Sequence, residues 1–371
     1  MTTNPRIPSL LLVLLACAGS AGPPVPSGPP LGAMTRLGDL SVGRALHTAT
    51  LLADGHVLVT GGMGPPGAIR SAELYAPDSG LSRATGSLGV GRMSHTATLL
   101  PDGKVLIVGG YGSGLAGSAT AELYDPATGS FAAAGALNEP HADHVAVLLD
   151  DGRVLIAGGD TSGAGRTPTE VAELYDPASG RFTATGSMHV PRVPYGAVRL
   201  RDGRVLVAGG TTTGKAVTAS AEIYDPQTES FTLTGSLRTA RRKHAGFLLP
   251  DGRVLIVGGT RGGDDGTVLR DAELFDPVQG TFSPAPPLLD PRFKFTVAAL
   301  PGGLVLVVGG ADALAEVYDA ASAGFRPVAG ASAALRLFPT ATPLADGSVL
   351  VTGGYSDRGS QPTVWRYRAA P

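Results

Sequence analysis

Residues 92–110 read RMSHTATLLPDGKVLIVGG, and residues 120–137 read TAELYDPATGSFAAAGAL. In the first stretch, Asp102-Gly103 separates two apolar runs, which is a strong hairpin signal because such turns need positive φ. The run KVLIV does not alternate polar and apolar residues, so it indicates a strand buried on both faces. The second stretch predicts a third strand ending at Asp125-Pro126 and a fourth around Phe131. Together they predict one four-stranded unit.

This unit recurs along the chain, and each copy is marked by a Gly-Gly pair. The pairs lie at 61–62, 109–110, 158–159, 209–210, 258–259, 309–310 and 353–354, with spacings of 48, 49, 51, 49, 51 and 44 residues. The hairpin signal recurs at Asp54-Gly55, Asp151-Gly152, Asp202-Gly203, Asp251-Gly252 and Asp346-Gly347, with Gly302-Gly303 in the sixth copy. A Gly doublet with a period near 50 residues resembles the kelch-repeat β-propeller family.

The resemblance covers residues 33–371 and implies an all-β fold, a seven-bladed β-propeller of four-stranded kelch blades. One departure concerns the tryptophan usual in the family's fourth strand. Its place is taken by Phe or Leu, at Leu81, Phe131, Phe182, Phe231, Phe282 and Phe325.

Strand counting predicts how the ring closes. The seventh copy contains the three strands LFPTATPL, SVLVTGG and TVWRYR, and the sequence then stops at Pro371. Residues 33–39 stand before the first complete copy, at the place of a fourth strand. We therefore expect the N-terminal strand to complete the last blade, which removes an exposed seam.

Composition excludes several classes of protein. The 371 residues include 54 Gly and 30 Pro, only 16% are charged, and the net charge is −2. So much glycine disfavours a helical fold, and a disordered chain would have higher charge and lower hydrophobicity. A nucleic-acid-binding protein would need a basic excess, so no nucleic-acid partner is expected.

The N-terminus predicts export. Leu10–Ala16 is an apolar run of seven residues, too short to span a bilayer but suited to a signal peptide. It leads into Leu14-Leu15-Ala16-Cys17, which resembles a bacterial lipobox, so residues 1–17 are interpreted as a signal peptide with Cys17 as the lipidation site. Residues 18–32 form a Pro/Gly-rich tether. These features predict a lipoprotein of the outer membrane or cell envelope, with cleavage to a soluble secreted or periplasmic protein as the alternative.

Sequence motifs for catalysis are scarce. Some kelch proteins are copper radical oxidases, whose cofactor needs a cysteine cross-linked to tyrosine, and the predicted propeller has no cysteine. We reject that activity, and we expect no catalytic residue, no cofactor and no metal. His141, Asp143 and His144 could be considered as metal ligands, but three candidates within four residues rarely reach one ion.

One constellation recurs just before each first strand. A basic residue is followed three positions later by His or an aromatic residue in most copies, and in a propeller this segment lies at one mouth of the central channel. Because arginine binds carboxylates bidentately, the ring predicts an anionic ligand. Its members are Arg44, His47, Arg92, His95, His141, His144, Arg192, Tyr195, Arg241, His244, Arg292 and Arg336.

A structural interpretation of this ring stays open beside the binding one. Each of six copies also carries a glutamate in its third strand, at Glu73, Glu122, Glu173, Glu222, Glu273 and Glu316. Pairs between Arg and Glu within the blades would explain the recurrence equally. The basic run Arg238–His244 is interpreted as a solvated loop, with contact to an anionic partner as the alternative.

These observations favour a monomeric, non-catalytic binding module, attached to a membrane only through a lipid anchor. Its partner would be a protein or a polysaccharide, bound at one propeller face. The alternative is a sugar-active enzyme similar to the kelch mutarotases that act on sialic acid. Such an enzyme would need a carboxylate and an arginine converging at the channel mouth.

Overall fold

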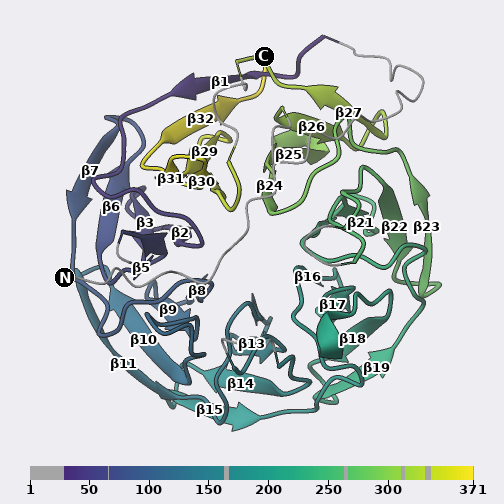
Figure 1. Ribbon diagram of the computed structural model, residues 1–371, viewed down its shortest axis with the longest axis horizontal. Coiled ribbons are helices and arrows are strands. Elements are labelled where there is room, and N and C mark those ends of the chain that lie inside the picture. The colour runs from purple at the N-terminus through teal and green to yellow at the C-terminus, as the bar shows by residue number, and fades with distance from the viewer. Residues whose placement is uncertain are drawn as a thin grey trace, which may run out of the picture.

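The computed structural model describes residues 29–65, 67–162, 167–262, 266–310, 314–330 and 336–370. Cys17, the predicted signal peptide and the first part of the predicted tether lie outside these residues. The described part contains seven antiparallel four-stranded sheets. Figure 1 shows them arranged as blades around a central axis, in the order of the sequence. The predicted all-β, seven-bladed propeller is confirmed.

The first-named strand of each blade lies nearest the axis, and the other three follow it outward. Blade 1 contains β2 (Thr48–Leu51), β3 (Val57–Thr60), β6 (Ala72–Ala76) and β7 (Leu81–Ala84). Blade 2 contains β8 (Thr96–Leu99), β9 (Val105–Val108), β10 (Thr120–Asp125) and β11 (Ser130–Ala136). Blade 3 contains β12 (Val145–Leu148), β13 (Val154–Ala157), β14 (Ala172–Asp176) and β15 (Arg181–Ala184). Blade 4 contains β16 (Ala197–Arg199), β17 (Val205–Ala208), β18 (Ala221–Asp225) and β19 (Ser230–Leu233).

Blade 5 contains β20 (Ala245–Leu248), β21 (Val254–Val257), β22 (Ala272–Asp276) and β23 (Thr281–Ala285). Blade 6 contains β24 (Phe295–Ala299), β25 (Leu304–Gly309), β26 (Glu316–Asp319) and β27 (Gly324–Pro327). Blade 7 contains β28 (Thr340–Pro343), β29 (Val349–Thr352), β32 (Val364–Arg368) and β1 (Ala33–Arg36). The remaining elements are two small hairpins and two 3₁₀ turns: β4 (Met63–Gly64) with β5 (Gly67–Ala68), β30 (Tyr355–Ser356) with β31 (Gly359–Ser360), η1 (Thr213–Lys215) and η2 (Pro301–Gly303).

The core lies between the blades. The second strand of a blade is buried on both faces because each face packs against a neighbouring blade, as the unbroken apolar runs predict. Val154 and Ile156 in β13 pack with blade 2, while Leu155 and Ala157 pack with blade 4. Successive residues of this strand thus pack against opposite neighbouring blades, so every apolar residue of the run is buried.

The N-terminal strand closes the ring. In Figure 1, β1 runs along the outer edge of β32, and it pairs with that strand from Ala33 opposite Arg368 to Arg36 opposite Trp365. Met34 is buried in the core between blades 6 and 7. The predicted closure is therefore confirmed, and the two termini of the propeller share one blade.

Each blade has two ends, and they form the two faces of the molecule. The turns between first and second strands define the hairpin face, where Asp102 and its equivalents lie. The Gly-Gly pairs at the ends of the second strands define the opposite Gly-Gly face, where the recurring basic residues lie. Gly109 and Gly110 have φ of +62° and +91°, and a Cβ on Gly109 would lie 2.1 Å from the His141 carbonyl oxygen. Only glycine fits there, because the next blade approaches this turn so closely.

Candidate functional site

Five of the recurring arginines are buried inside the blades. Arg241 is representative: Nη1 donates to the carbonyls of Gly258 at 2.9 Å and Asp271 at 3.0 Å, and Nη2 donates to Glu273 Oε1 at 2.8 Å. Glu273 also accepts from the backbone N–H groups of Arg238 and Thr239. One arginine thus joins the Gly-Gly turn, the third strand and the connection from the preceding blade. We call this arrangement the arginine staple.

The same staple occurs in four other blades. With Arg241–Glu273 the five pairs are Arg44–Glu73, Arg92–Glu122, Arg192–Glu222, Arg241–Glu273 and Arg292–Glu316. All five arginines are at most 1% exposed. Burial lowers their pKa, and the adjacent glutamate charge acts in the opposite direction. In this arrangement the guanidinium groups face into the blade, so the geometry favours the structural interpretation of these residues over direct ligand contact.

Blades 3 and 7 depart from the staple. In blade 3, His141 replaces arginine: its Nδ1 lies 2.7 Å from the Gly158 carbonyl oxygen, and its Nε2 lies 3.4 Å from Glu173 Oε1. Both ring nitrogens therefore face acceptor oxygens. In blade 7, Trp365 occupies the strand position of the glutamate, and Arg336 is only half-buried.

The residues three positions after the arginines form a second ring, between the blades. In three blades this residue is a histidine whose Nε2 is hydrogen-bonded to a threonine hydroxyl of the preceding blade. The pairs are His47 with Thr352 at 2.9 Å, His95 with Thr48 at 3.0 Å, and His144 with Thr96 at 2.8 Å. We call these contacts the histidine–threonine ring. They join blades across 47, 48 and 305 residues of sequence.

Sequence reasoning missed the threonine partners. A signal for two of them was present, because Thr48 and Thr96 directly follow a histidine of the ring. His244 also belongs to the ring by position, and it is 4% exposed. Backbone hydrogen bonds with Ala208 and Arg241 partly offset the lowering of its pKa by burial.

Between the arginine and histidine positions, one residue in each of six blades turns the chain with positive φ. We call these residues, with Pro194 at the same position of blade 4, the collar. Its other members are Leu46, Ser94, Asp143, Lys243, Lys294 and Phe338, with φ from +50° to +59°. Backbone hydrogen bonds run around the collar from Asp143 to Ser94, from Ser94 to Leu46, from Phe338 to Lys294 and from Lys294 to Lys243. The collar thus forms the part of the Gly-Gly face closest to the arginines and histidines.

Charge is distributed unevenly over the collar. On blades 2 and 3, the Tyr111 hydroxyl donates to Asp160 at 2.8 Å and lies 3.4 Å from Asp143. On blades 5 to 7, Nζ of Lys294 lies 5.1 Å from the Phe293 ring and 5.0 Å from the Phe338 ring. Nζ of Lys243 lies 6.0 Å from the Phe293 ring. We call Lys243, Lys294, Phe293 and Phe338 the basic sector.

Arg238 is exposed, but most of the run Arg238–His244 is not the solvated loop expected from its charge. Arg241, Arg242, Lys243 and His244 are at most 7% exposed. The arginine staple takes Arg241 into the blade, and His244 lies between blades 4 and 5. The high charge density from Arg241 to His244 therefore marks a packed junction.

Comparison with known proteins agrees with this geometry. Residues 241–289, which begin at Arg241 and include all of blade 5, match the Kelch motif. The fold is a seven-bladed β-propeller, and its fifth blade matches this motif. None of the curated proteins with which the sequence was compared matches it. Among solved structures, this propeller is similar to a novel fungal alcohol oxidase of the AA5 family, in complex with copper. The TM-score is 0.70 at 18% identity, over 91% of this chain and 76% of the oxidase chain. At this identity the similarity concerns the fold alone.

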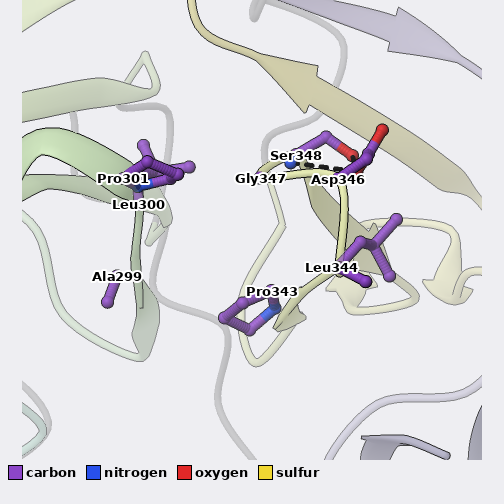
Figure 2. Close-up of a pocket in the computed structure, with 9 residues that line it drawn as sticks. Ala299, Leu300, Pro301, Pro343, Leu344, Asp346, Gly347 and Ser348 are labelled. Atoms are coloured by element: carbon purple, nitrogen blue, oxygen red, sulfur yellow. Dashed lines mark hydrogen bonds between the residues drawn. The ribbon is translucent and has the colours of Figure 1, made fainter. Parts of the chain in front are cut away.

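The propeller also has a cavity on its hairpin face, between blades 6 and 7. It has a volume of about 440 Å³. Figure 2 shows Ala299, Leu300 and Pro301 on one side, with Pro343 and Leu344 across from them. Asp346 lines it too, but this carboxylate accepts from Ser348 and is paired with Arg366 at 2.6 Å. The cavity is thus mostly apolar, and its one carboxylate is already neutralised.

Two further features of the described residues bear on function. They bring together no group of three or more His, Cys, Asp or Glu side chains able to hold a metal ion. His141 and His144 lie with ring centroids 5.9 Å apart, but His141 faces Glu173 and His144 faces Thr96. No helix in the described ranges has the length and apolarity to span a membrane.

The histidine–threonine ring predicts a loss of stability in acid. Burial, followed by the charges of Arg92 and Arg241, lowers the pKa of His95 and His244 to about 3. The pKa values of His47 and His144 are lowered well below the usual value as well. An unfolded histidine has a pKa of about 6.5, so between about pH 6.5 and 3 the unfolded chain binds more protons. The free energy of unfolding therefore decreases as the pH is lowered, by about 1.4 kcal/mol per pH unit for each histidine.

We expect urea denaturation midpoints to fall steadily from about pH 7 to about pH 4.5. The variant His244→Phe carries the residue type that blade 6 has at this position, Phe295. Its free energy of unfolding should change less steeply with pH, by about 1.4 kcal/mol per pH unit. Glu73 and Glu173 have lowered pKa values and act in the same direction, but only at more acidic pH. A midpoint that does not change between about pH 7 and about pH 5 would contradict a neutral buried ring.

Proposed function

We propose that this kelch propeller is a non-catalytic binding module that recognises an acidic glycan on its Gly-Gly face. The observation that carries the proposal is the basic sector, where Lys243 and Lys294 stand beside the rings of Phe293 and Phe338. Ammonium groups attract carboxylates, and aromatic rings offer an apolar surface for the C–H face of a sugar. The two kinds of group together suit a sugar that carries a carboxylate.

Direct support for the enzymatic alternative would be an unpaired carboxylate beside an arginine. Among the described residues, the six repeated glutamates are each engaged by arginine or histidine. Asp346, the carboxylate of the hairpin-face cavity, is paired with Arg366. These contacts support the binding module as the better proposal.

We also propose that the module is exported and held at the cell envelope through a lipid on Cys17. The support is the apolar run Leu10–Ala16 followed by cysteine and a Pro/Gly-rich tether. Mass spectrometry of the mature N-terminus tests this proposal: a chain that keeps residues 1–16, or begins after Cys17 without lipid, would overturn it.

The binding proposal predicts that polygalacturonate, an acidic polysaccharide, binds more tightly than neutral dextran. The double variant Lys243→Met and Lys294→Met should bind polygalacturonate at least about tenfold more weakly, because a hydrogen bond to a charged group contributes about 1.5–3 kcal/mol. Methionine keeps much of the side-chain length, so the aromatic contacts retain their packing. Affinity is measured by calorimetric titration at low and physiological salt.

The matched control is Lys104→Met, which removes an exposed lysine on the hairpin face that lies 3.9 Å from Asp102. It should bind polygalacturonate as the wild type does. Equal affinity for both polysaccharides, or an unaffected double variant, would overturn the proposal. Tighter binding of polyglutamate than of polygalacturonate would replace the glycan by an acidic protein.

A further inference from the structure

The cavity on the hairpin face is lined by side chains that have little hydrogen bonding to offer an occupant. Its polar side chains are Asp346 and Ser348, which bond each other at 2.5 Å, as Figure 2 shows. Arg366 donates to both of them, at 2.6 Å to Asp346 and 2.9 Å to Ser348. The rest of the lining is Ala, Leu, Pro and Gly. An occupant should therefore be apolar and poor in N–H donors, because a buried donor without an acceptor costs free energy.

The sequence of blade 7 explains why the cavity lies at this junction. In four blades the first strand ends in leucine. This leucine packs toward the preceding blade: Leu51 lies in one cluster with Leu344, and Leu148 lies in one cluster with Leu100. In blade 7 the same position is Pro343, which is exposed. Proline has a smaller side chain than leucine, so the junction between blades 6 and 7 is left unfilled at this point.

The described part of the chain begins at the same junction. The Pro29 carbonyl accepts from Arg326 of blade 6 at 2.7 Å. Leu31 packs on the hydrophobic cluster between blades 6 and 7, and that cluster also contains Leu300 of the cavity wall. The residues that precede Pro29 therefore start from the two blades that enclose the cavity.

Arg368 connects the start of the propeller to the cavity wall. A Cβ on Gly32 would lie 2.2 Å from the Arg368 carbonyl oxygen, and Nη2 of Arg368 lies 3.8 Å from Asp346 Oδ2. One arginine thus separates Gly32 from a residue that lines the cavity. Residues 23–28 span about 19 Å in the polyproline II conformation, at about 3.1 Å per residue, so the chain before Pro29 is long enough to return to the cavity.

The composition of this segment matches the cavity. Residues 22–30 read GPPVPSGPP, with five prolines, one valine and no charged residue. Proline has no backbone N–H, so such a segment needs few acceptors. We propose that residues 23–26, Pro-Pro-Val-Pro, dock in the hairpin-face cavity and form a strap across blades 6 and 7. Attachment to the same chain favours docking, because it gives the segment a high effective concentration at the cavity.

The strap would decide which face of the propeller is presented. Cys17 is six residues before Pro23, so docking brings it to the hairpin face. With the lipid proposed for Cys17, the Gly-Gly face and its basic sector then point away from the membrane. The strap itself depends neither on the lipid nor on a glycan, so its test is independent of both proposals.

Disulfide trapping tests the strap. A chain that begins at Ala18 contains no cysteine, so Val25→Cys with Ala345→Cys introduces the only two thiols. The matched control combines Val25→Cys with Ala53→Cys. Both alanines are exposed in the same tetrapeptide, Leu-Ala-Asp-Gly, but Ala345 lines the cavity and Ala53 belongs to blade 1. In a glutathione buffer the bond to position 345 should form at least about tenfold faster, because docking raises the effective concentration of one thiol at the other.

A third chain guards against a disturbed turn at position 345. Serine in place of Pro23, Pro24 and Pro26 leaves the described propeller unchanged and should make the two disulfides form at equal rates. Equal rates with the original segment, or a rate difference that survives the serine substitutions, would overturn the strap. A disulfide-linked dimer on a non-reducing gel would also overturn it, and would assign the cavity to the segment of a second copy.

Discussion

A chain that begins at residue 37, without β1, will unfold at much lower urea concentration than one that begins at residue 29. The deletion removes the outer strand of blade 7 and uncovers the edge of β32. It also removes Met34 from the core and breaks the bonds from Leu31 to Pro327 and from Met34 to Ala329. Loss of a buried methionine side chain alone costs about 2–5 kcal/mol, and the lost strand pairing adds to it.

The deletion should also change the oligomeric state. An unpaired strand edge is a template for pairing with another chain, so light scattering should detect aggregates of the shortened protein. The chain beginning at residue 29 is the control, since it keeps β1 and every contact described for it. Equal denaturation midpoints for the two chains would contradict closure by the N-terminal strand.

Arg241→Met will destabilise the propeller by about 3–5 kcal/mol, the usual effect of removing one partner of a buried ion pair. The reason is that Glu273 loses its countercharge while it stays buried, and the carbonyls of Gly258 and Asp271 lose their donor. The free energy of unfolding is measured by urea denaturation. Adding Glu273→Gln to this variant should recover part of the loss, because no uncompensated charge then remains.

The control for this prediction is Arg253→Met on the hairpin face. Arg253 is paired with Asp251 at 2.7 Å, but both side chains are nearly half-exposed. Exposed ion pairs contribute about 0–1 kcal/mol, so this variant should be close to wild type. If Arg241→Met is as mild as Arg253→Met, the arginine staple does not stabilise the blade.

Much of the fold could be predicted because it follows from local signals. The turn at Asp102-Gly103, the unbroken run of β9 and the repeat of about 50 residues each act over a few residues or one blade. Even the closure by β1 followed from counting strands. These signals sufficed because every blade repeats the same pattern of strands and turns. A weak signal in one copy could therefore be interpreted by comparison with the other copies.

The direction of the site residues was harder to predict. The recurrence of arginine was consistent with a ring around a ligand and equally with an ion pair inside each blade. The buried contact of Arg241 with Glu273 favours the ion pair inside the blade. The collar carried no sequence signal, since Lys243 and Lys294 adopt positive φ without being glycine. Tertiary contacts impose that backbone conformation, and they bring Phe293 and Phe338 beside Lys294.

By itself, the sequence determined the number of blades, the strands within them and the residues at which each blade turns, because those depend on periodicity and on glycine at φ that other residues avoid. Only the tertiary structure decided which polar groups meet. His95 and Thr48 are 47 residues apart, and His47 and Thr352 are 305 apart. Such contacts arise where neighbouring blades pack, so they become visible only when the blades lie side by side.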